Sequence, residues 1–127
     1  MALKVVVVDD EPHIRHVIAL KMQKNGFEVL TAADGEEALD LVTQEQPDLL
    51  ITDYQMPVMS GLDLCRELRR QDETAHIPIL MLTARGFDLS DQEREASGIL
   101  HLMSKPFSPA EVLAKVRDLT TAAANQE

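Results

Sequence analysis

Short apolar runs, rich in β-branched residues, recur along the chain and alternate with segments of helical periodicity. The runs cover residues 3–8, 27–31, 49–53, 77–82 and 99–103. Runs of this length that are apolar almost throughout are typical of strands buried on both faces, as in parallel sheets. Five such strands, each followed by a helical segment, predict an α/β domain built on a doubly wound five-stranded parallel sheet.

Capping residues predict where the helices begin. Pro12 is well placed in the first turn of the first helix. Asp34 and Glu37 form a capping pair at the start of the second helix, and Ser108 with Glu111 repeats the pattern before the last one. The apolar positions expected to face the sheet are Ile14, Val17, Ile18 and Met22, then Ala38, Leu41 and Val42, then Leu64, Cys65 and Leu68, and finally Val112, Leu113, Val116 and Leu119.

The 127 residues suit one domain with a substantial core. We expect this domain to span residues 1–121, and residues 122–127 to be a frayed tail or the start of a linker. The polar segment 85–97 predicts only a short fourth helix. The apolar run 3–8 is too short for a signal peptide, and no stretch approaches the roughly 20 apolar residues of a membrane span. A cytoplasmic protein without membrane contact is the prediction.

The net charge of −10, with only 12 Lys and Arg residues, argues against a nucleic-acid surface. A metal ion or a basic partner suits this charge better. The spacing of cations in two helices indicates solvated faces. These cations are Arg15, Lys21 and Lys24 in the first helix and Arg66, Arg69 and Arg70 in the third. The lone Cys65 lies among apolar positions, which predicts a buried thiol in a reducing compartment.

Polar residues stand at the ends of four of the five expected strands. They are Asp9, Asp10, Asp53, Thr83 and Lys105. Parallel strands bring their carboxyl ends to one edge of the sheet, where open α/β sheets bind their ligands. The flavodoxin-like strand order 2-1-3-4-5, taken from that known fold, pushes the second strand outward and joins the first to the third. This order explains why the second strand contributes no such residue.

Three carboxylates in one pocket repel one another, so their joint ionisation requires a compensating positive charge. Lys105 supplies one positive unit and a divalent cation would supply the rest. Ligation by oxygen alone favours Mg²⁺ or Mn²⁺ over Zn²⁺. Mg²⁺ held by one or two carboxylates is the form in which proteins usually manage phosphoryl groups, so the cluster indicates phosphoryl-transfer chemistry.

Four motifs at these strand ends resemble those of the response-regulator receiver domain of bacterial two-component signalling. The motifs are Val8-Asp9-Asp10-Glu11, then Asp53-Tyr54-Gln55-Met56-Pro57 with Ser60-Gly61 after it, then Thr83-Ala84 and Lys105-Pro106-Phe107. Each is weak alone, but the four in this order are specific. The resemblance runs from about residue 3 to residue 119.

The resemblance implies a phosphoacceptor function. Asp53 would accept a phosphoryl group from the phosphohistidine of a histidine kinase or phosphotransfer protein. Asp10, Asp53 and the backbone carbonyl of Gln55 would ligate Mg²⁺, with Asp9 acting through a metal-bound water. The chain would be a signalling receiver, not an enzyme, and would assist only its own phosphorylation and dephosphorylation.

The resemblance also implies a switch. Lys105 would pair with Asp53 and then with the phosphoryl oxygens, and the Thr83 hydroxyl would close onto those oxygens. A cis peptide is expected before Pro106. The switched surface would then contact a downstream protein target or an output domain, which the sequence does not identify.

Leu102 departs from the family pattern, which commonly has Tyr or Phe three positions before the Lys. Leucine has neither a ring nor a hydroxyl to move inward with Thr83. Either backbone shifts and packing carry the signal, or its coupling to Asp53 is weak. The apolar fifth strand 99–103 is also an edge strand that needs cover. Packing beneath neighbouring helices and a homodimer through the fourth helix, fifth strand and fifth helix both satisfy this need.

Two other functions compete with the phosphoacceptor hypothesis. A receiver-like interaction module that no longer uses phosphate is favoured by Leu102 and opposed by the retained pocket residues. A small Mg²⁺-dependent phosphatase would usually place a second acid two residues after its Asp nucleophile, where this chain has Gln55. His13 and His16, just after the acids, are expected to be exposed helix residues without a metal role.

Overall fold

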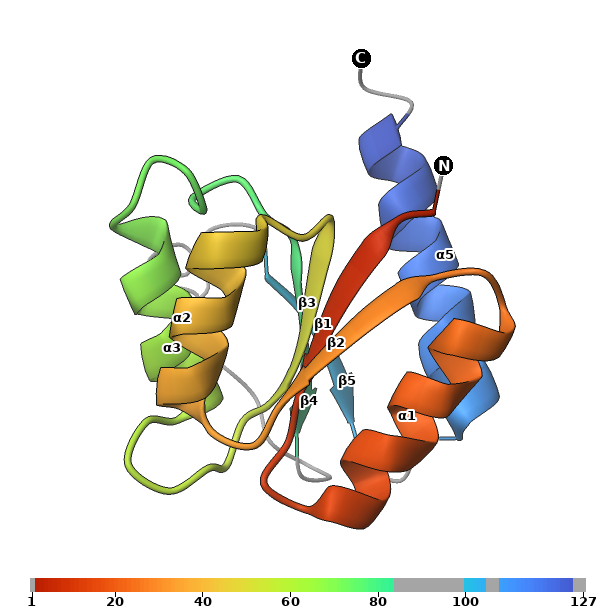
Figure 1. Ribbon diagram of the computed structural model, residues 1–127, viewed down its shortest axis with the longest axis horizontal. Coiled ribbons are helices and arrows are strands. Elements are labelled where there is room, and N and C mark those ends of the chain that lie inside the picture. Colours follow the sequence, from red (N-terminus) through yellow and green to blue (C-terminus); the bar gives the residue numbers. More distant parts are fainter. Residues whose placement is uncertain (1, 84–99, 105–107, 125–127) are drawn as a thin grey trace.

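Five parallel strands form one sheet in the predicted order β2-β1-β3-β4-β5 (Figure 1). The computed structural model describes residues 2–83, 100–104 and 108–124. The strands are β1 (Lys4–Val8), β2 (Glu28–Ala32), β3 (Leu49–Asp53), β4 (Ile79–Thr83) and β5 (Leu100–Ser104). The helices in the described ranges are α1 (Pro12–Lys24), α2 (Gly35–Glu45), α3 (Gly61–Arg69) and α5 (Pro109–Ala124).

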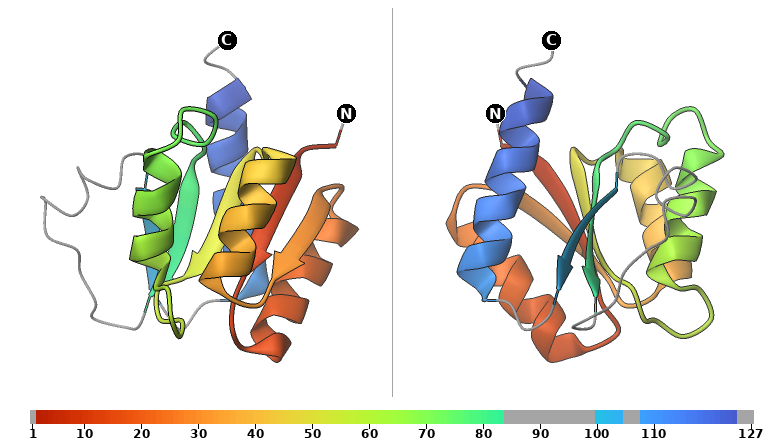
Figure 2. Two further views of the ribbon diagram at one scale, coloured as in Figure 1. Left: turned by 60° about the vertical axis from the view of Figure 1, so that its left-hand side comes forward. Right: turned by 180° about the vertical axis from the view of Figure 1, so that it is seen from behind.

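The helices cover both faces of the sheet, α1 and α5 on one and α2 and α3 on the other (Figures 1 and 2). The alternation of side chains along each strand divides the core accordingly. Val5 and Val7 pack with residues of α1 and α5, whereas Val6 and Val8 pack with residues of α2 and α3. Cys65 of α3 is fully buried in the second group, as predicted.

Strand boundaries differ from the predicted ones by one or two residues, for local reasons. The amide of Phe27 donates to the Met22 carbonyl (3.1 Å), so it completes the end of α1 and β2 begins one residue later. Gly26, at φ 93°, makes this reversal. The amide of Ile77 bonds the Thr74 carbonyl (3.2 Å) and Pro78 has no donor, so β4 begins two residues later than predicted.

Capping side chains fix the helix starts that the sequence indicated. Asp34 accepts the amide hydrogen of Glu37 (2.8 Å), and the hydroxyl of Ser108 accepts that of Glu111 (3.1 Å). The Glu37 carboxylate accepts from the amide of Ala33, one residue earlier than a standard capping box would have it. Ser60 and Asp63 form a full capping box at the start of α3, where no cap was predicted.

The interpretation of the helix cations as solvated faces is wrong for two arginines. Arg69 is half-buried and donates to the carbonyls of Thr74 (3.3 Å) and Ile77 (2.9 Å), and burial lowers the pKa of its guanidinium. Arg15 is also half-buried and donates to the backbone carbonyl of Asp9 (2.8 Å). Both side chains therefore tie connecting segments to a helix.

Several predictions concern residues outside the described ranges or near their ends. The short fourth helix expected within 85–97 and the first residue of the expected fifth strand, Ile99, lie outside the described residues. Helix α5 continues through Ala124, three residues into the expected tail. The domain boundary after residue 121 stays a prediction. Among the described residues, no helix has the length and apolar character needed to cross a bilayer.

The edge strand β5 packs against both layers of the core. Met103 packs on the α1–α5 side and Leu102 on the other side. His101 is half-buried, and its pKa is lowered from the ordinary value of 6.5 by burial and by the nearby charge of Lys115 on α5. Side chains 101–103 are thus partly covered by this chain alone, as the packing alternative expects. The homodimer stays a prediction.

We predict that replacing His101 flattens the pH dependence of stability. Because folding lowers its pKa, the unfolded chain binds more protons on acidification. His101 therefore contributes its full share to the free energy of unfolding above pH 6.5, and this share is lost as the pH falls below that value. The melting temperature of the H101Q variant should therefore fall less than that of the wild type between pH 7.5 and pH 5.5. H76Q, which changes an exposed histidine, is the control, and parallel curves for all three proteins would contradict the prediction.

Candidate functional site

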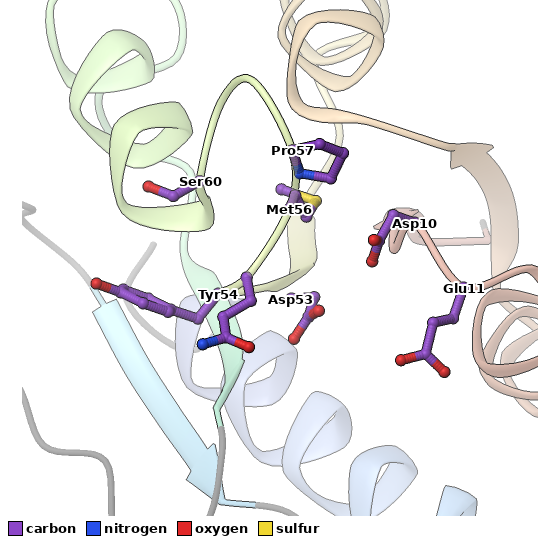
Figure 3. A pocket seen from close by; sticks show the side chains of 8 residues that line it. Asp10, Glu11, Asp53, Tyr54, Met56, Pro57 and Ser60 are labelled. Carbon is purple, nitrogen blue, oxygen red and sulfur yellow. The ribbon is translucent and has the colours of Figure 1, made fainter.

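Strand order brings the acidic residues of two strands together. β1 and β3 are hydrogen-bonded neighbours with Val8 opposite Thr52, so Asp9 and Asp53 follow at the same edge. Asp9, Asp10 and Asp53 each place a carboxylate oxygen within 4.8 Å of the others. Asp9 and Asp53 are buried (1% and 5% exposed), whereas Asp10 is exposed. Figure 3 shows Asp10 and Asp53 pointing into the same space.

The turn between β1 and α1 shapes one side of this cluster. Asp9 donates its amide to the Ala32 carbonyl (3.3 Å) and accepts the amide of Glu11 on its own carboxylate (2.9 Å). Glu11 is the N-cap of α1 but makes no side-chain capping bond. Because α1 begins directly after these acids, the positive end of its helix dipole lies next to the acidic cluster, where it favours negative charge.

The loop after β3 shapes the other side. The amide of Tyr54 donates to the Leu82 carbonyl of β4 (2.9 Å), and Gly61 at the start of α3 donates to the Tyr54 carbonyl (2.8 Å). A Cβ atom at Gly61 would collide with the carbonyl oxygen of Asp53. Only glycine lets the helix start this close to the strand end, so the loop that carries Gln55 folds back beside Asp53.

These two connections enclose an open pocket of about 470 Å³ at the carboxyl edge of the sheet (Figure 3). Its lining residues are Asp10, Glu11, Asp53, Tyr54, Gln55, Met56, Pro57 and Ser60. Glu11 belongs to the motif Val8-Asp9-Asp10-Glu11, but no role in the site was predicted for its carboxylate. Its place in the chain, two residues after Asp9 and at the N-cap of a helix, was the available signal.

Thr83 is the last residue of β4 and is 1% exposed. Its hydroxyl oxygen is buried and has no hydrogen-bond partner among the described residues. β4 lies next to β3, with Leu82 opposite Asp53, so Thr83 ends the strand beside the acidic cluster. A buried hydroxyl without a partner is costly, and it is available to a ligand that offers an acceptor.

Other predicted site residues have mixed outcomes. Lys105 and Pro106 lie outside the described residues, so their predicted roles stay predictions. Leu102 packs against a small cluster formed by Leu62 and Met81, and the ring of Tyr54 packs against the same cluster. Figure 3 shows the Tyr54 ring pointing away from Asp53 towards β5.

The two histidines after the acids, His13 and His16, are exposed on α1, as expected.

The donor set suits a hard divalent cation. Three carboxylates supply oxygen ligands only, and no His or Cys belongs to the cluster in the described part of the chain. One of the three side chains is exposed to solvent, so a bound ion could keep several waters, as Mg²⁺ prefers. The residues therefore fit Mg²⁺ or Mn²⁺ better than Zn²⁺.

Comparison with known proteins decides the family. The family model of the response regulator receiver domain matches residues 5–117. The chain belongs to this family. It is a receiver domain of the two-component type, with the flavodoxin-like fold of chemotaxis response regulators.

Solved receiver structures agree closely with this chain. The chemotaxis response regulator CheY4 of Vibrio cholerae is 37% identical, with a TM-score of 0.86 over 94% of this chain and 99% of that one. The receiver domain of sensor histidine kinase PA1611 from Pseudomonas aeruginosa is 27% identical, with a TM-score of 0.82 over 95% and 99% of the two chains. That structure has a magnesium ion coordinated in its active site cleft.

A curated relative is longer. The probable transcriptional regulator ycf27 of Cyanophora paradoxa is 44% identical over 117 residues, which are 91% of this chain and 47% of that protein. The chain therefore spans about half the length of this relative.

We predict that T83V raises the free energy of unfolding by about 1 kcal/mol, because valine has nearly the same shape and removes a buried hydroxyl that lacks a partner. Urea denaturation of the metal-free protein measures this change. T83S keeps the hydroxyl and loses a methyl group, so it should be less stable than the wild type. A destabilised T83V would contradict the prediction.

Proposed function

We propose that this receiver domain accepts a phosphoryl group on Asp53 from the phosphohistidine of a histidine kinase or phosphotransfer protein. A carboxylate oxygen of Asp53 forms a bond to phosphorus while the bond from phosphorus to the donor imidazole nitrogen breaks. The imidazole keeps the electron pair of that bond and takes a proton from solvent. The ionised carboxylate needs no general base.

The acidic cluster is the observation that carries this proposal. Asp53 is buried, yet it lines an open pocket together with Asp10, and a carboxylate oxygen of Asp9 lies within 4.8 Å of both. Such crowding of like charges is unfavourable unless a cation joins it. A site that attracts Mg²⁺ and presents a carboxylate to solvent suits reaction with an anionic phosphoryl donor.

Asp10, Asp53 and the carbonyl of Gln55 would hold Mg²⁺ or Mn²⁺, with Asp9 acting through a bound water, as the family resemblance implies. When bound, the ion supplies positive charge that offsets the carboxylates and the phosphoryl oxygens. The Thr83 hydroxyl then donates to a phosphoryl oxygen, and Lys105 neutralises another.

The response to phosphorylation is a change in protein contacts. Tyr54 lines the pocket, donates its amide to Leu82 of β4 and packs against the cluster of Leu62 and Met81, which Leu102 also contacts. A downstream protein target or an output domain reads this change. The absence of nucleic-acid binding and the cytoplasmic location stay predictions.

Leu102 favours one alternative function, an interaction module that phosphate does not control. Its side chain packs against Leu62 and Met81 and carries no ring to move inward. The phosphatase alternative remains weaker, because Gln55 at the pocket edge cannot donate a proton as a second acid would.

Phosphorylation is tested with acetyl phosphate and Mg²⁺ followed by intact-mass measurement. We expect one added phosphoryl group, about 80 Da, in the wild type and none in D53N, because the amide removes the nucleophile. D40N, which changes an exposed aspartate on α2, should behave as the wild type. Absence of the adduct from the wild type with every donor tried would favour the interaction module.

Metal binding is tested by the melting temperature in rising MgCl₂. Binding to the folded state alone stabilises it, by about 2.7 kcal/mol at 100 times the Kd. D10N should need at least tenfold more Mg²⁺ for the same shift, since it removes an exposed ligand without disturbing the core. D40N again serves as the control. Equal titrations of D10N and the wild type would contradict the assignment of Asp10.

A further inference from the structure

Arg15 reaches back from α1 to the end of β1. Its Nη1 donates to the backbone carbonyl of Asp9 (2.8 Å), while its own amide donates to the carbonyl of Glu11 (3.1 Å) as part of the helix. The side chain is half-buried, in contrast to the exposed Lys24 at the far end of the same helix. One guanidinium therefore bridges the helix and the turn that carries Asp10.

We propose that Arg15 is a positioning residue for the cation site, which it serves by fixing the backbone of the turn 9–11. This inference rests on the proposed function, because it assigns to Arg15 a part in binding Mg²⁺. Arg15 does not itself contact the ion. It acts through the Asp9 peptide, and its effect is exerted on the direction in which Asp10 points.

Several hydrogen bonds hold the turn 9–11 in this shape. Besides the contact from the Arg15 side chain, they include the Asp9 amide to the Ala32 carbonyl, the Glu11 amide to the Asp9 carboxylate and the Arg15 amide to the Glu11 carbonyl. The second of these uses a carboxylate that belongs to the acidic cluster. Glu11 provides no side-chain cap that could fix the helix start. Among these bonds, the contact to the Asp9 carbonyl is the one in which a side chain from outside the turn holds its backbone.

The need for such a tether follows from Asp10. Its side chain is exposed, and among the described residues its carboxylate makes no hydrogen bond. The place of this carboxylate near Asp9 and Asp53 is therefore set by the backbone of the turn. A metal ligand whose position is fixed by a further hydrogen bond binds the metal more tightly. Loss of that hydrogen bond typically lowers the metal affinity tenfold or more.

Arg15 could also act simply as a positive charge near the acids, and substitution separates the two effects. Arg15→Met removes both the hydrogen bond and the charge, and Arg15→Lys keeps the charge without the planar fork of donors. Attraction between exposed charges weakens as the salt concentration rises, whereas an effect of the backbone conformation does not depend on salt. Lys24→Met is the matched control, because it removes one charge from the same helix far from the turn.

The experiment measures the Mg²⁺ Kd by calorimetry at 0.05 M and 0.5 M KCl, and hydrogen exchange of the Glu11 amide in the metal-free protein. We expect R15M to weaken Mg²⁺ binding about tenfold relative to the wild type at both salt concentrations. Exchange at Glu11 should accelerate, while amides in β3 and β4 keep their protection. R15K should give intermediate values, and K24M should match the wild type.

Three results would overturn the proposal. They are an unchanged Kd in R15M, a loss of affinity that disappears at 0.5 M KCl, and unchanged exchange at Glu11. If R15M does not fold, wild-type values for both measurements in R15K would overturn it. Failure of the proposed function is distinguishable, because a wild type that binds no Mg²⁺ contradicts the cation site while the Glu11 exchange still tests whether Arg15 fixes the turn.

Discussion

Electrostatic repulsion among three carboxylates is the constraint around which this domain is built. Two unit charges 4 Å apart repel by about 4 kcal/mol at the effective dielectric constant of a protein surface. A fold that crowds Asp9, Asp10 and Asp53 within 4.8 Å therefore gives up stability at this edge unless positive charge compensates. The start of α1, the positive end of its helix dipole, supplies part of that compensation from the backbone.

The remainder of the architecture makes this crowding unavoidable. The valines of β1 and the apolar run of β3 are buried on both faces, so the two strands cannot shift against each other without exposing core residues. Gly61 holds α3 against the end of β3, and a side chain there would push the loop away from Asp53. The core thus provides the free energy that keeps the acids together.

The sequence predicted the strand order and the neighbouring positions of the acids because both follow from topology. Apolar runs identified the strands, and parallel strands place their carboxyl ends at one edge. It did not predict that Arg15 would turn back to Asp9, because helical spacing alone made this cation look solvated. It also did not predict the local hydrogen bonds at the helix starts, such as the one from the Ala33 amide to the Glu37 carboxylate, because these bonds depend on the exact shape of the turn before the helix.

Tyr54 has a practical consequence for studies of this protein in solution. It is the sole tyrosine of a chain that lacks tryptophan, and it immediately follows Asp53. Its backbone is bonded to both β4 and α3, and its ring rests on Leu62 and Met81. When tyrosine is excited selectively, the emission of the unlabelled protein therefore originates from one side chain at the junction of strand, loop and helix, which makes it a built-in optical probe of that junction.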